Sequence, residues 1–533
     1  MQHDAARIAT QQPGQRRLPA MRARRLRWSR SADTPGHEPY SSSTRTGVAT
    51  VQETQVRQGA KVFGVWSLGI FTFSFLANVN TTPELATFGL GAIILTLLAI
   101  GLFLVPTAMS SAELGSSFPR TGGIYVWTRL AFGERWAFVV IWIEWVSFVV
   151  AWPGIMGTIT LQAAFVIDPD LQNNNLFLIA IVVAVTWIAA FAALRGLQLA
   201  KGSAWFSVVV GIVLPTLLLV GFAIAWIVSG RRVEMATDAG SLVPNLGLGN
   251  IAFLSGALLM FSGIEISAIH AGDVENPART IPRANVIAVA LCFVLFVPLT
   301  LALATVIPAK DIDIVTGVLQ AARAMFDAFG VSWLVPVFAA MLVLGLAAAL
   351  VQILGGPSRG LLVAARQGGN LPPVLQRENG RGMPVAIILL QATISSVLAL
   401  GYHLLGSVEN AWFMFSLVQT NMTLLLYLLL FASVVACRRL RPDGARPFRI
   451  PGGWLGLIVV LGVGACVCLL GLTLSLFPTD DAKGLPLWTY ELALIGGTVG
   501  FVVLPLIFRL FRKPSWQTEP EVGAPRTPDV AEV

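Results

Sequence analysis

Carboxylates inside long apolar runs are the residues in this 533-residue sequence best suited to chemistry. Glu265 lies in the apolar segment 261–270, which also holds Gly263 and His270, and Glu144 lies in the apolar run 136–166. A carboxylate in hydrocarbon is costly unless it is neutral, paired or in contact with water, and the cores of these runs hold no Lys or Arg. Glu265, Glu144 and His270 are therefore candidates for a proton-linked role, and the two acids are also candidates for binding an ammonium group.

Each candidate also has a simpler interpretation. Glu265 or Glu144 could be a neutral carboxylic acid that is hydrogen-bonded to a neighbouring helix, and His270 could form only a local cap. Glu113, at the inner end of the run 86–112, is expected to be a structural anchor.

The composition indicates the solvent in which these runs lie. Hydrophobic residues make up 55% of the chain, charged residues only 12%, and the mean hydropathy is +0.75. An average soluble domain has about 25% charged residues, so a soluble enzyme is excluded. The runs are continuous and about 20 residues long, which predicts an all-α integral membrane protein.

The sequence predicts twelve membrane-spanning helices. They are 62–80, 86–112, 136–166, 176–195, 203–229, 250–271, 284–307, 331–354, 385–405, 411–436, 455–477 and 489–510. With the N-terminus inside, the inner loops hold most of the Lys and Arg residues. The positive-inside rule then predicts a multi-pass protein of the cytoplasmic membrane with both termini in the cytoplasm.

The parts outside the spans are expected to be tails. Residues 1–61 are rich in Arg, and they are interpreted as a disordered, basic cytoplasmic tail. Residues 62–510 are expected to form one twelve-span membrane domain, and 511–533 a cytoplasmic C-terminal tail. A basic tail could bind anionic lipid, while binding to nucleic acid is not expected.

Two spans are predicted to be broken. Polar residues accumulate along 69–83 and 261–270, and Ser262 with Gly263 would let the chain unwind so that a solute approaches the backbone. Phe73 and Phe261 flank the two polar breaks and could form walls of the substrate site. The broken spans are five spans apart, as expected for two corresponding five-helix repeats.

The sequence holds no motif for ATP binding, serine hydrolysis or zinc proteolysis, and no metal site or cofactor is expected. The span 331–354 offers no Ser or Thr at 340–350 to bind a sodium ion, which favours a proton-coupled or exchange mechanism. An integral-membrane enzyme and a channel are the alternatives from other classes. The inner loop 355–384 lacks a pairing of nucleophile and base, and no filter motif is evident.

The stretch from Ser262-Gly263-Ile264-Glu265 to Glu275-Asn276-Pro277-Ala278-Arg279 is similar to the span-six signature of the amino acid–polyamine–organocation superfamily. Within that superfamily the chain resembles the glutamate/γ-aminobutyrate antiporters. Three further matching stretches are 119–127, 356–360 and 448–453. The resemblance covers about residues 62–512.

The resemblance implies two inverted five-helix repeats followed by two C-terminal helices, with helices 1 and 6 discontinuous and with alternating access. It places the substrate-binding residues at Thr72, Phe73, Ser74, Phe261, Ser262, Gly263 and Glu265. Secondary transport of amino acids is implied, by exchange or, alternatively, by proton-coupled uptake. Ala349 stands where an acid is expected in the glutamate/γ-aminobutyrate antiporters, so the substrate is expected to be an amino acid or a related amine.

Overall fold

The computed structural model describes residues 61–244, 261–404, 408–442, 444–477 and 487–519. Nearly all of the ordered structure in these ranges is helical. The β-bridges that pair Phe63 with Val274 and Glu378 with Pro384 are isolated.

The structure describes sixteen α-helices. Their bounds are α1 (Val65–Leu76), α2 (Thr82–Ala86), α3 (Gly91–Ala99), α4 (Val105–Ser117), α5 (Ile124–Phe132), α6 (Glu134–Ile167), α7 (Asn175–Ala193), α8 (Leu197–Val208), α9 (Leu214–Val228), α11 (Pro277–Val306), α12 (Gly317–Ala328), α13 (Leu334–Gly368), α14 (Val385–Leu404), α15 (Val408–Leu440), α16 (Gly453–Leu474) and α17 (Leu487–Leu510). The 3₁₀ segments used below are η1 (Val79–Thr81), η6 (Ile266–Asp273) and η10 (Pro514–Trp516).

Nine helices among the described residues are long and apolar enough to cross a membrane. They are Gly91–Ser117, Glu134–Ile167, Asn175–Ala193, Leu197–Val228, Pro277–Val306, Leu334–Gly368, Met414–Leu440, Gly453–Leu474 and Tyr490–Leu510. Each overlaps one predicted span, which confirms a helical protein with several membrane-spanning segments.

The other three predicted spans differ in the structure. The apolar part of α14, Val385–Gly401, is shorter than the nine. The first predicted span, 62–80, contains only the 12-residue helix α1. Most of the predicted span 250–271 lies outside the described residues, which resume at Phe261.

Two of the nine spans contain a π-helical turn, and one of these turns permits a close helix contact. Residues Ile100–Leu104 join α3 to α4, and Val209–Val213 join α8 to α9. At the second turn, a Cβ atom added to Gly211 would lie 2.6 Å from Gly345 Cα in α13. Glycine at both positions therefore lets the two backbones touch, as small residues do at helix contacts in membranes.

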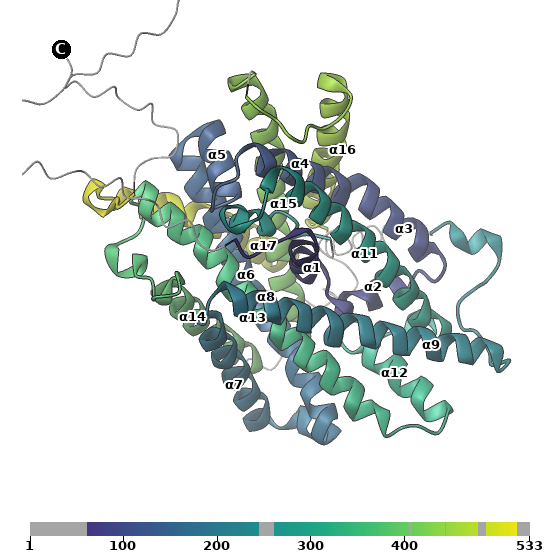
Figure 1. The fold of residues 1–533 in the computed structure, drawn as a ribbon. Helices are drawn as coiled ribbons and strands as arrows, with labels where there is room; N and C mark the ends of the chain where they lie inside the picture. The colour runs from purple at the N-terminus through teal and green to yellow at the C-terminus, as the bar shows by residue number, and fades with distance from the viewer. Residues whose placement is uncertain (1–60, 245–260, 405–407, 443, 478–486, 520–533) are drawn as a thin grey trace, which may run out of the picture. The chain divides into compact units, whose positions relative to one another are not determined.

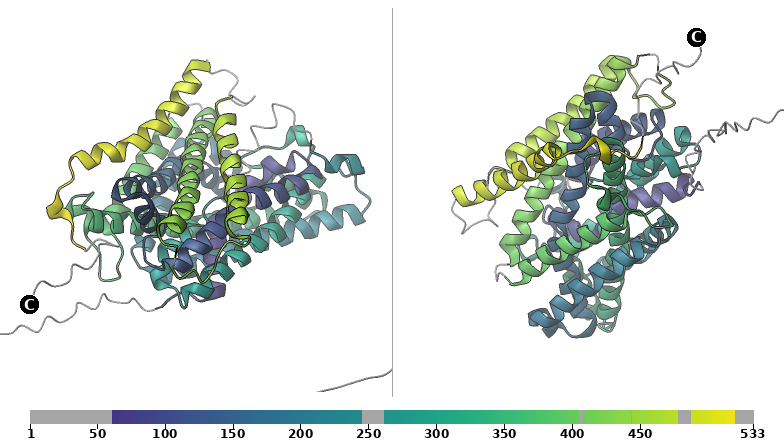
Figure 2. Two further views of the ribbon diagram at one scale, coloured as in Figure 1. Left: turned by 90° about the horizontal axis from the view of Figure 1, so that it is seen from above. Right: turned by 90° about the vertical axis from the view of Figure 1, so that its left-hand side faces the viewer.

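Helix α1 lies in the middle of the bundle (Figure 1) and contacts α8, α11 and α13. The long helix α6 packs mainly against α13 and α15. Helices α16 and α17 lie on the outside next to α15 (Figure 2). A short central helix surrounded by long ones leaves polar backbone groups near the middle of the bundle.

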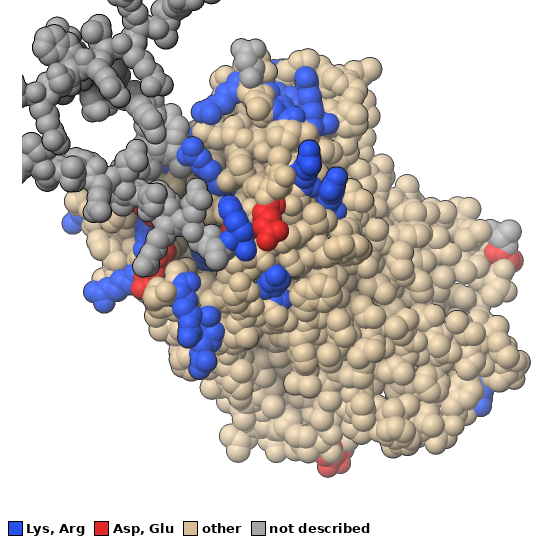
Figure 3. Space-filling view, viewed as in Figure 1, with Lys and Arg blue, Asp and Glu red and all other residues tan. Residues whose placement is uncertain are grey.

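The charged residues are unevenly distributed. Lys and Arg side chains gather over one part of the face seen in Figure 3, and most of the remaining surface in that view carries no charge. Exposed apolar side chains such as Leu217, Ile224 and Leu455 belong to the spans. An uncharged apolar surface is what contact with lipid requires.

Candidate functional site

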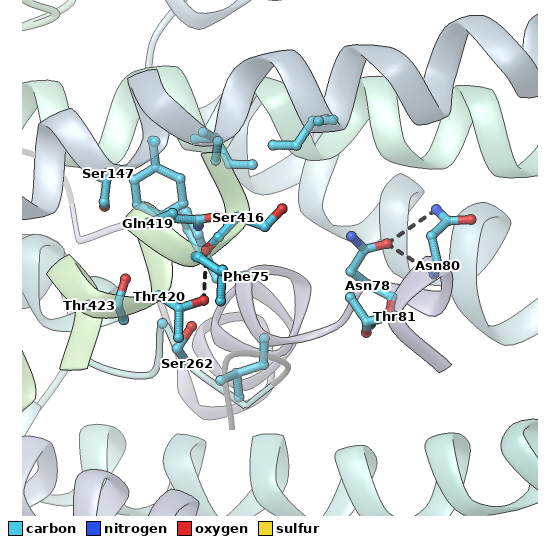
Figure 4. Close-up of a pocket in the computed structure, with 18 of the residues that line it drawn as sticks. Phe75, Asn78, Asn80, Thr81, Ser147, Ser262, Ser416, Gln419, Thr420 and Thr423 are labelled. Carbon is cyan, nitrogen blue, oxygen red and sulfur yellow. Dashed lines mark hydrogen bonds between the residues drawn. The ribbon is translucent and has the colours of Figure 1, made fainter. Parts of the chain in front are cut away.

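A cavity of about 260 Å³ lies among α1, α6, α13 and α15. Its walls also include the residues between α1 and α2 and the segment before η6. Figure 4 shows polar side chains gathered in two groups, one around Asn78, Asn80 and Thr81, and the other around Ser262, Gln419 and Thr420. The interior therefore offers hydrogen-bonding groups to a solute at two separate places.

The first group exists because helix α1 ends early. Ala77 and Asn78 adopt extended backbone conformations, and the Asn78 side chain accepts a hydrogen bond from the Asn80 amide to begin η1. Pro83 stands near the start of α2, where its missing N–H costs nothing. Asn80 Oδ1 also accepts from Gln162 Nε2 of α6 at 2.5 Å, which fixes this turn against a long helix.

The second group surrounds an irregular segment at Gly263. Its φ of +112° is a conformation that L-residues with side chains rarely adopt, so glycine is required here. Its backbone N–H donates to the Tyr427 hydroxyl of α15 at 2.6 Å. Non-helical backbone at this position is thus satisfied by another span rather than by its own helix.

Glu265 follows two residues later and is 3% exposed. Its Oε2 accepts a hydrogen bond from the Tyr427 hydroxyl at 2.6 Å, so one tyrosine contacts both the Gly263 amide and this acid. Glu265 lines the cavity together with Ser262 and Gly263. The buried Glu265 carboxylate therefore has a tyrosine as its hydrogen-bond partner.

Glu144 reaches the same cavity from α6. It is 2% exposed, and neither of its carboxylate oxygens has a hydrogen-bond partner. Glu265 lines the same cavity. The cavity wall thus holds one carboxylate with a partner and one without.

His270 belongs to a different cluster. Its Nδ1 lies 2.9 Å from an Arg359 guanidinium nitrogen, and the same nitrogen donates to Asp273 Oδ2 at 2.9 Å. Phe71 packs edge-on against the imidazole ring with centroids 5.3 Å apart. His270 does not line the cavity that contains the two acids.

The remaining predicted site residues lie in or beside the cavity wall. Ser74 lines the cavity and donates to Gln352 Oε1 of α13 at 2.6 Å. Thr72 donates to the Leu68 carbonyl of its own helix, and Phe73 is fully buried in the core. Phe261 packs against Phe296 with ring centroids 6.2 Å apart. These three side chains support the wall without lining it.

Sequence reasoning missed the contribution of α15. Residues on one face of this helix line the cavity or contact its acid, and they are Ser416, Gln419, Thr420, Thr423 and Tyr427. Ser416, Thr420, Thr423 and Tyr427 are spaced by three or four residues, which is a helical period, and Gln419 lies next to this row in a largely apolar run. That polar stripe was the available signal.

Among the described residues, no group of three or more His, Cys, Asp or Glu side chains could hold a metal ion.

The spans and the polar cavity that they surround define a multi-pass membrane transporter. The family described as amino acid permease matches residues 62–499, and the chain belongs to this family.

Curated relatives match along nearly the same length. An uncharacterized transporter of Legionella pneumophila is 32% identical over 84% of this chain and 96% of its own. A glutamate/gamma-aminobutyrate antiporter of Lactococcus lactis is 28% identical over 84% of this chain and 89% of its own. A probable agmatine/putrescine antiporter of the same species is 22% identical over 84% and 95%. These relatives are transporters and not enzymes.

Proposed function

We propose that this protein is a secondary active transporter that carries amino acids or related amines across the cytoplasmic membrane. The observation that carries the proposal is the cavity wall at Gly263 and Glu265, where irregular backbone, a buried acid and a tyrosine from another span meet. Solute carriers use interrupted helices of this kind to expose backbone groups near the middle of the membrane. The substrate-binding residues are Thr72, Phe73, Ser74, Phe261, Ser262, Gly263 and Glu265, the first two and Phe261 acting from behind the wall.

Transport would proceed by alternating access. We infer twelve spans arranged as two inverted five-helix repeats with two further C-terminal helices, and with spans one and six discontinuous. The early end of α1 at Leu76 and the positive φ of Gly263 support breaks in these two spans. Rigid movement of one repeat against the other would open the cavity to each side in turn.

Exchange of one solute for another is the mode that we favour, because two of the relatives named above are antiporters. Proton-coupled uptake is the second candidate, and the buried acids Glu265 and Glu144 support it. Glu265 is the first candidate for the proton-linked group, because its tyrosine partner ties it to the broken segment. Glu144 is the second, while the contact with Arg359 makes His270 the third.

Uptake into liposomes that contain the purified full-length protein tests this proposal. Labelled amino acids and amines are added outside, with or without an unlabelled solute inside. Exchange predicts accumulation only into preloaded liposomes, whereas symport predicts accumulation into empty liposomes under an imposed proton gradient. Absence of uptake for every compound in both formats would contradict transport, and uptake without saturation would indicate a channel.

The proposed topology places both termini in the cytoplasm, with a disordered basic tail over 1–61, a transporter domain over 62–510 and a C-terminal tail over 511–533. The gathering of Lys and Arg over one part of the surface supports this orientation (Figure 3). A chain that starts near Val51 is expected to insert and transport normally. Loss of transport by a correctly inserted short chain would contradict the assignment of the tail.

A further inference from the structure

We infer, on the basis of the proposed transport function, that this cavity selects solutes of net positive charge whose ammonium groups are held by its carboxylates, and that it rejects acidic solutes such as glutamate. The solute class is an organic amine, with a diamine as the best-matched form.

The described part of the cavity wall is acidic. Three of the described residues that line it are acids, Glu84, Glu144 and Glu265, and none of those lining residues is Lys, Arg or His. An acidic solute would bring a further negative charge into a cavity whose described lining residues include no cation to receive it. In surroundings of low dielectric constant, repulsion between such like charges is strong.

Glu144 is a buried acid whose carboxylate oxygens have no hydrogen-bond partner. A 2% exposed side chain with two unpartnered oxygens leaves hydrogen-bonding capacity unused in the wall of a cavity. Buried carboxylates normally receive hydrogen bonds, because leaving them unmade is costly. An ammonium group supplies both the donors and the opposite charge, so it satisfies this acid in a way that no other described lining residue does.

The Gly263 N–H is the backbone donor at the broken segment that could hold a solute's carboxylate. In carriers of amino acids, backbone N–H groups freed by an interrupted helix perform this task. Here the Gly263 N–H already donates to the Tyr427 hydroxyl at 2.6 Å. An amine without a carboxylate needs no such donor, and its binding leaves this hydrogen bond intact.

The acids that line the cavity come from separate segments of the chain. Glu84 belongs to α2, which follows the turn at Asn80, whereas Glu265 lies beside Ser262. Figure 4 shows Asn80 and Ser262 in the two separate polar groups of the cavity. Phe75 and Phe148 also line the wall and pack edge-to-face with ring centroids 6.5 Å apart, and aromatic rings attract cations while they also accept an alkyl chain. A short alkyl chain with an ammonium at each end matches this pattern.

Binding and exchange measured with a defined set of solutes test the inference. The set is 1,4-diaminobutane, lysine, γ-aminobutyrate and glutamate, each used to compete against labelled 1,4-diaminobutane on the full-length protein in liposomes. We expect the diamine and lysine to compete strongly, γ-aminobutyrate weakly, and glutamate not at all. Glutamate exchange at a rate equal to or above that of the diamine would overturn the inference while leaving transport itself established. Failure of all four solutes while another amino acid is transported would overturn the inference alone, and absence of uptake for every compound would contradict both.

Charge-removing variants separate the cavity acid from a general effect of charge. Glu144→Gln should weaken diamine binding by at least about tenfold, the effect of losing a hydrogen bond to a charged group. Asp327→Asn is the matched control, because it removes one negative charge from α12 at a side chain that does not line the cavity. If Glu144→Gln inserts poorly, Glu144→Asp is the second variant. It keeps the charge and should retain part of the binding. Unchanged diamine affinity in a well-inserted Glu144→Gln would overturn the role assigned to this acid.

Discussion

The hydroxyl of Tyr427 lies 2.6 Å from both the Glu265 carboxylate and the Gly263 amide. It donates to the carboxylate and accepts from the amide, so a single side chain of α15 holds the irregular segment before η6. Any movement of that segment away from α15 must break or exchange both hydrogen bonds. The tyrosine therefore links the position of a helix to the partner of a buried acid.

Removal of this hydroxyl should impair transport more than stability. Tyr427→Phe keeps the ring, which packs edge-on against Phe103 at 5.1 Å, but deletes both hydrogen bonds. A hydrogen bond to a charged group is worth about 1.5–3 kcal/mol, so we expect a measurable loss of thermal stability and a large loss of uptake. Tyr125→Phe is the control, because it deletes a hydrogen bond to the Glu134 carboxylate at a side chain that does not line the cavity. Equal uptake by the two variants would contradict the linking role.

A side chain at position 263 should block the site. Gly263→Leu places an L-residue at φ +112°, which costs about 1–3 kcal/mol, and adds volume to the cavity wall. We expect normal insertion with little or no uptake. Gly221→Leu is the matched control, because a Cβ atom at this α9 position meets no heavy atom within 4 Å. Full transport by Gly263→Leu would show that this segment does not contact the solute.

The ion pair between Glu113 and Arg438 should determine stability. The two side chains are 2% and 3% exposed and form two hydrogen bonds, at 2.6 and 2.5 Å, while Glu113 also accepts from the Ile450 amide. Glu113→Gln leaves the buried guanidinium without an opposite charge at this distance, and we expect a loss of about 3–5 kcal/mol. Thermal unfolding in detergent measures it.

A surface pair provides the comparison for this measurement. Arg323 and Asp327 lie 3.7 Å apart with side chains 60% and 49% exposed, so Asp327→Asn should cost less than about 1 kcal/mol. A similar small effect of Glu113→Gln would contradict the anchoring role expected for Glu113 from the sequence.

The sequence predicted the parts of the fold that depend on hydrophobicity alone. Runs of about 20 apolar residues identify spans, and the nine long helices follow from them. The exact end of α1 at Leu76 was less accessible, because the predicted span 62–80 continues past it, while the turn is fixed by Asn78 and by a contact of Asn80 with Gln162 of α6. Contacts between segments that are distant in the sequence produce no periodic pattern of residues.

The site shows the same division. Glu265 and Glu144 could be found because acids are rare in apolar runs, and both line the cavity. His270 also drew attention as a polar residue, but its partner Arg359 is 89 residues away in the sequence, so the ion cluster could not be anticipated. Tyr427 was missed because a tyrosine among leucines resembles ordinary apolar packing until the polar stripe of α15 is considered as a whole.

The pH profile of exchange for Glu265→Gln tests the central claim most directly. Glutamine keeps the volume of the side chain and resembles its protonated form, but it cannot gain or lose a proton. Tyr427 of α15 donates to this acid and Glu144 of α6 lines the same cavity, and both stay unchanged in the variant. Exchange in liposomes is measured from mildly acidic to neutral pH beside the wild type. We predict that Glu265→Gln inserts and then loses either most of its exchange or most of its dependence on pH. An unchanged rate together with an unchanged pH profile would contradict a role for this carboxylate in the transport cycle.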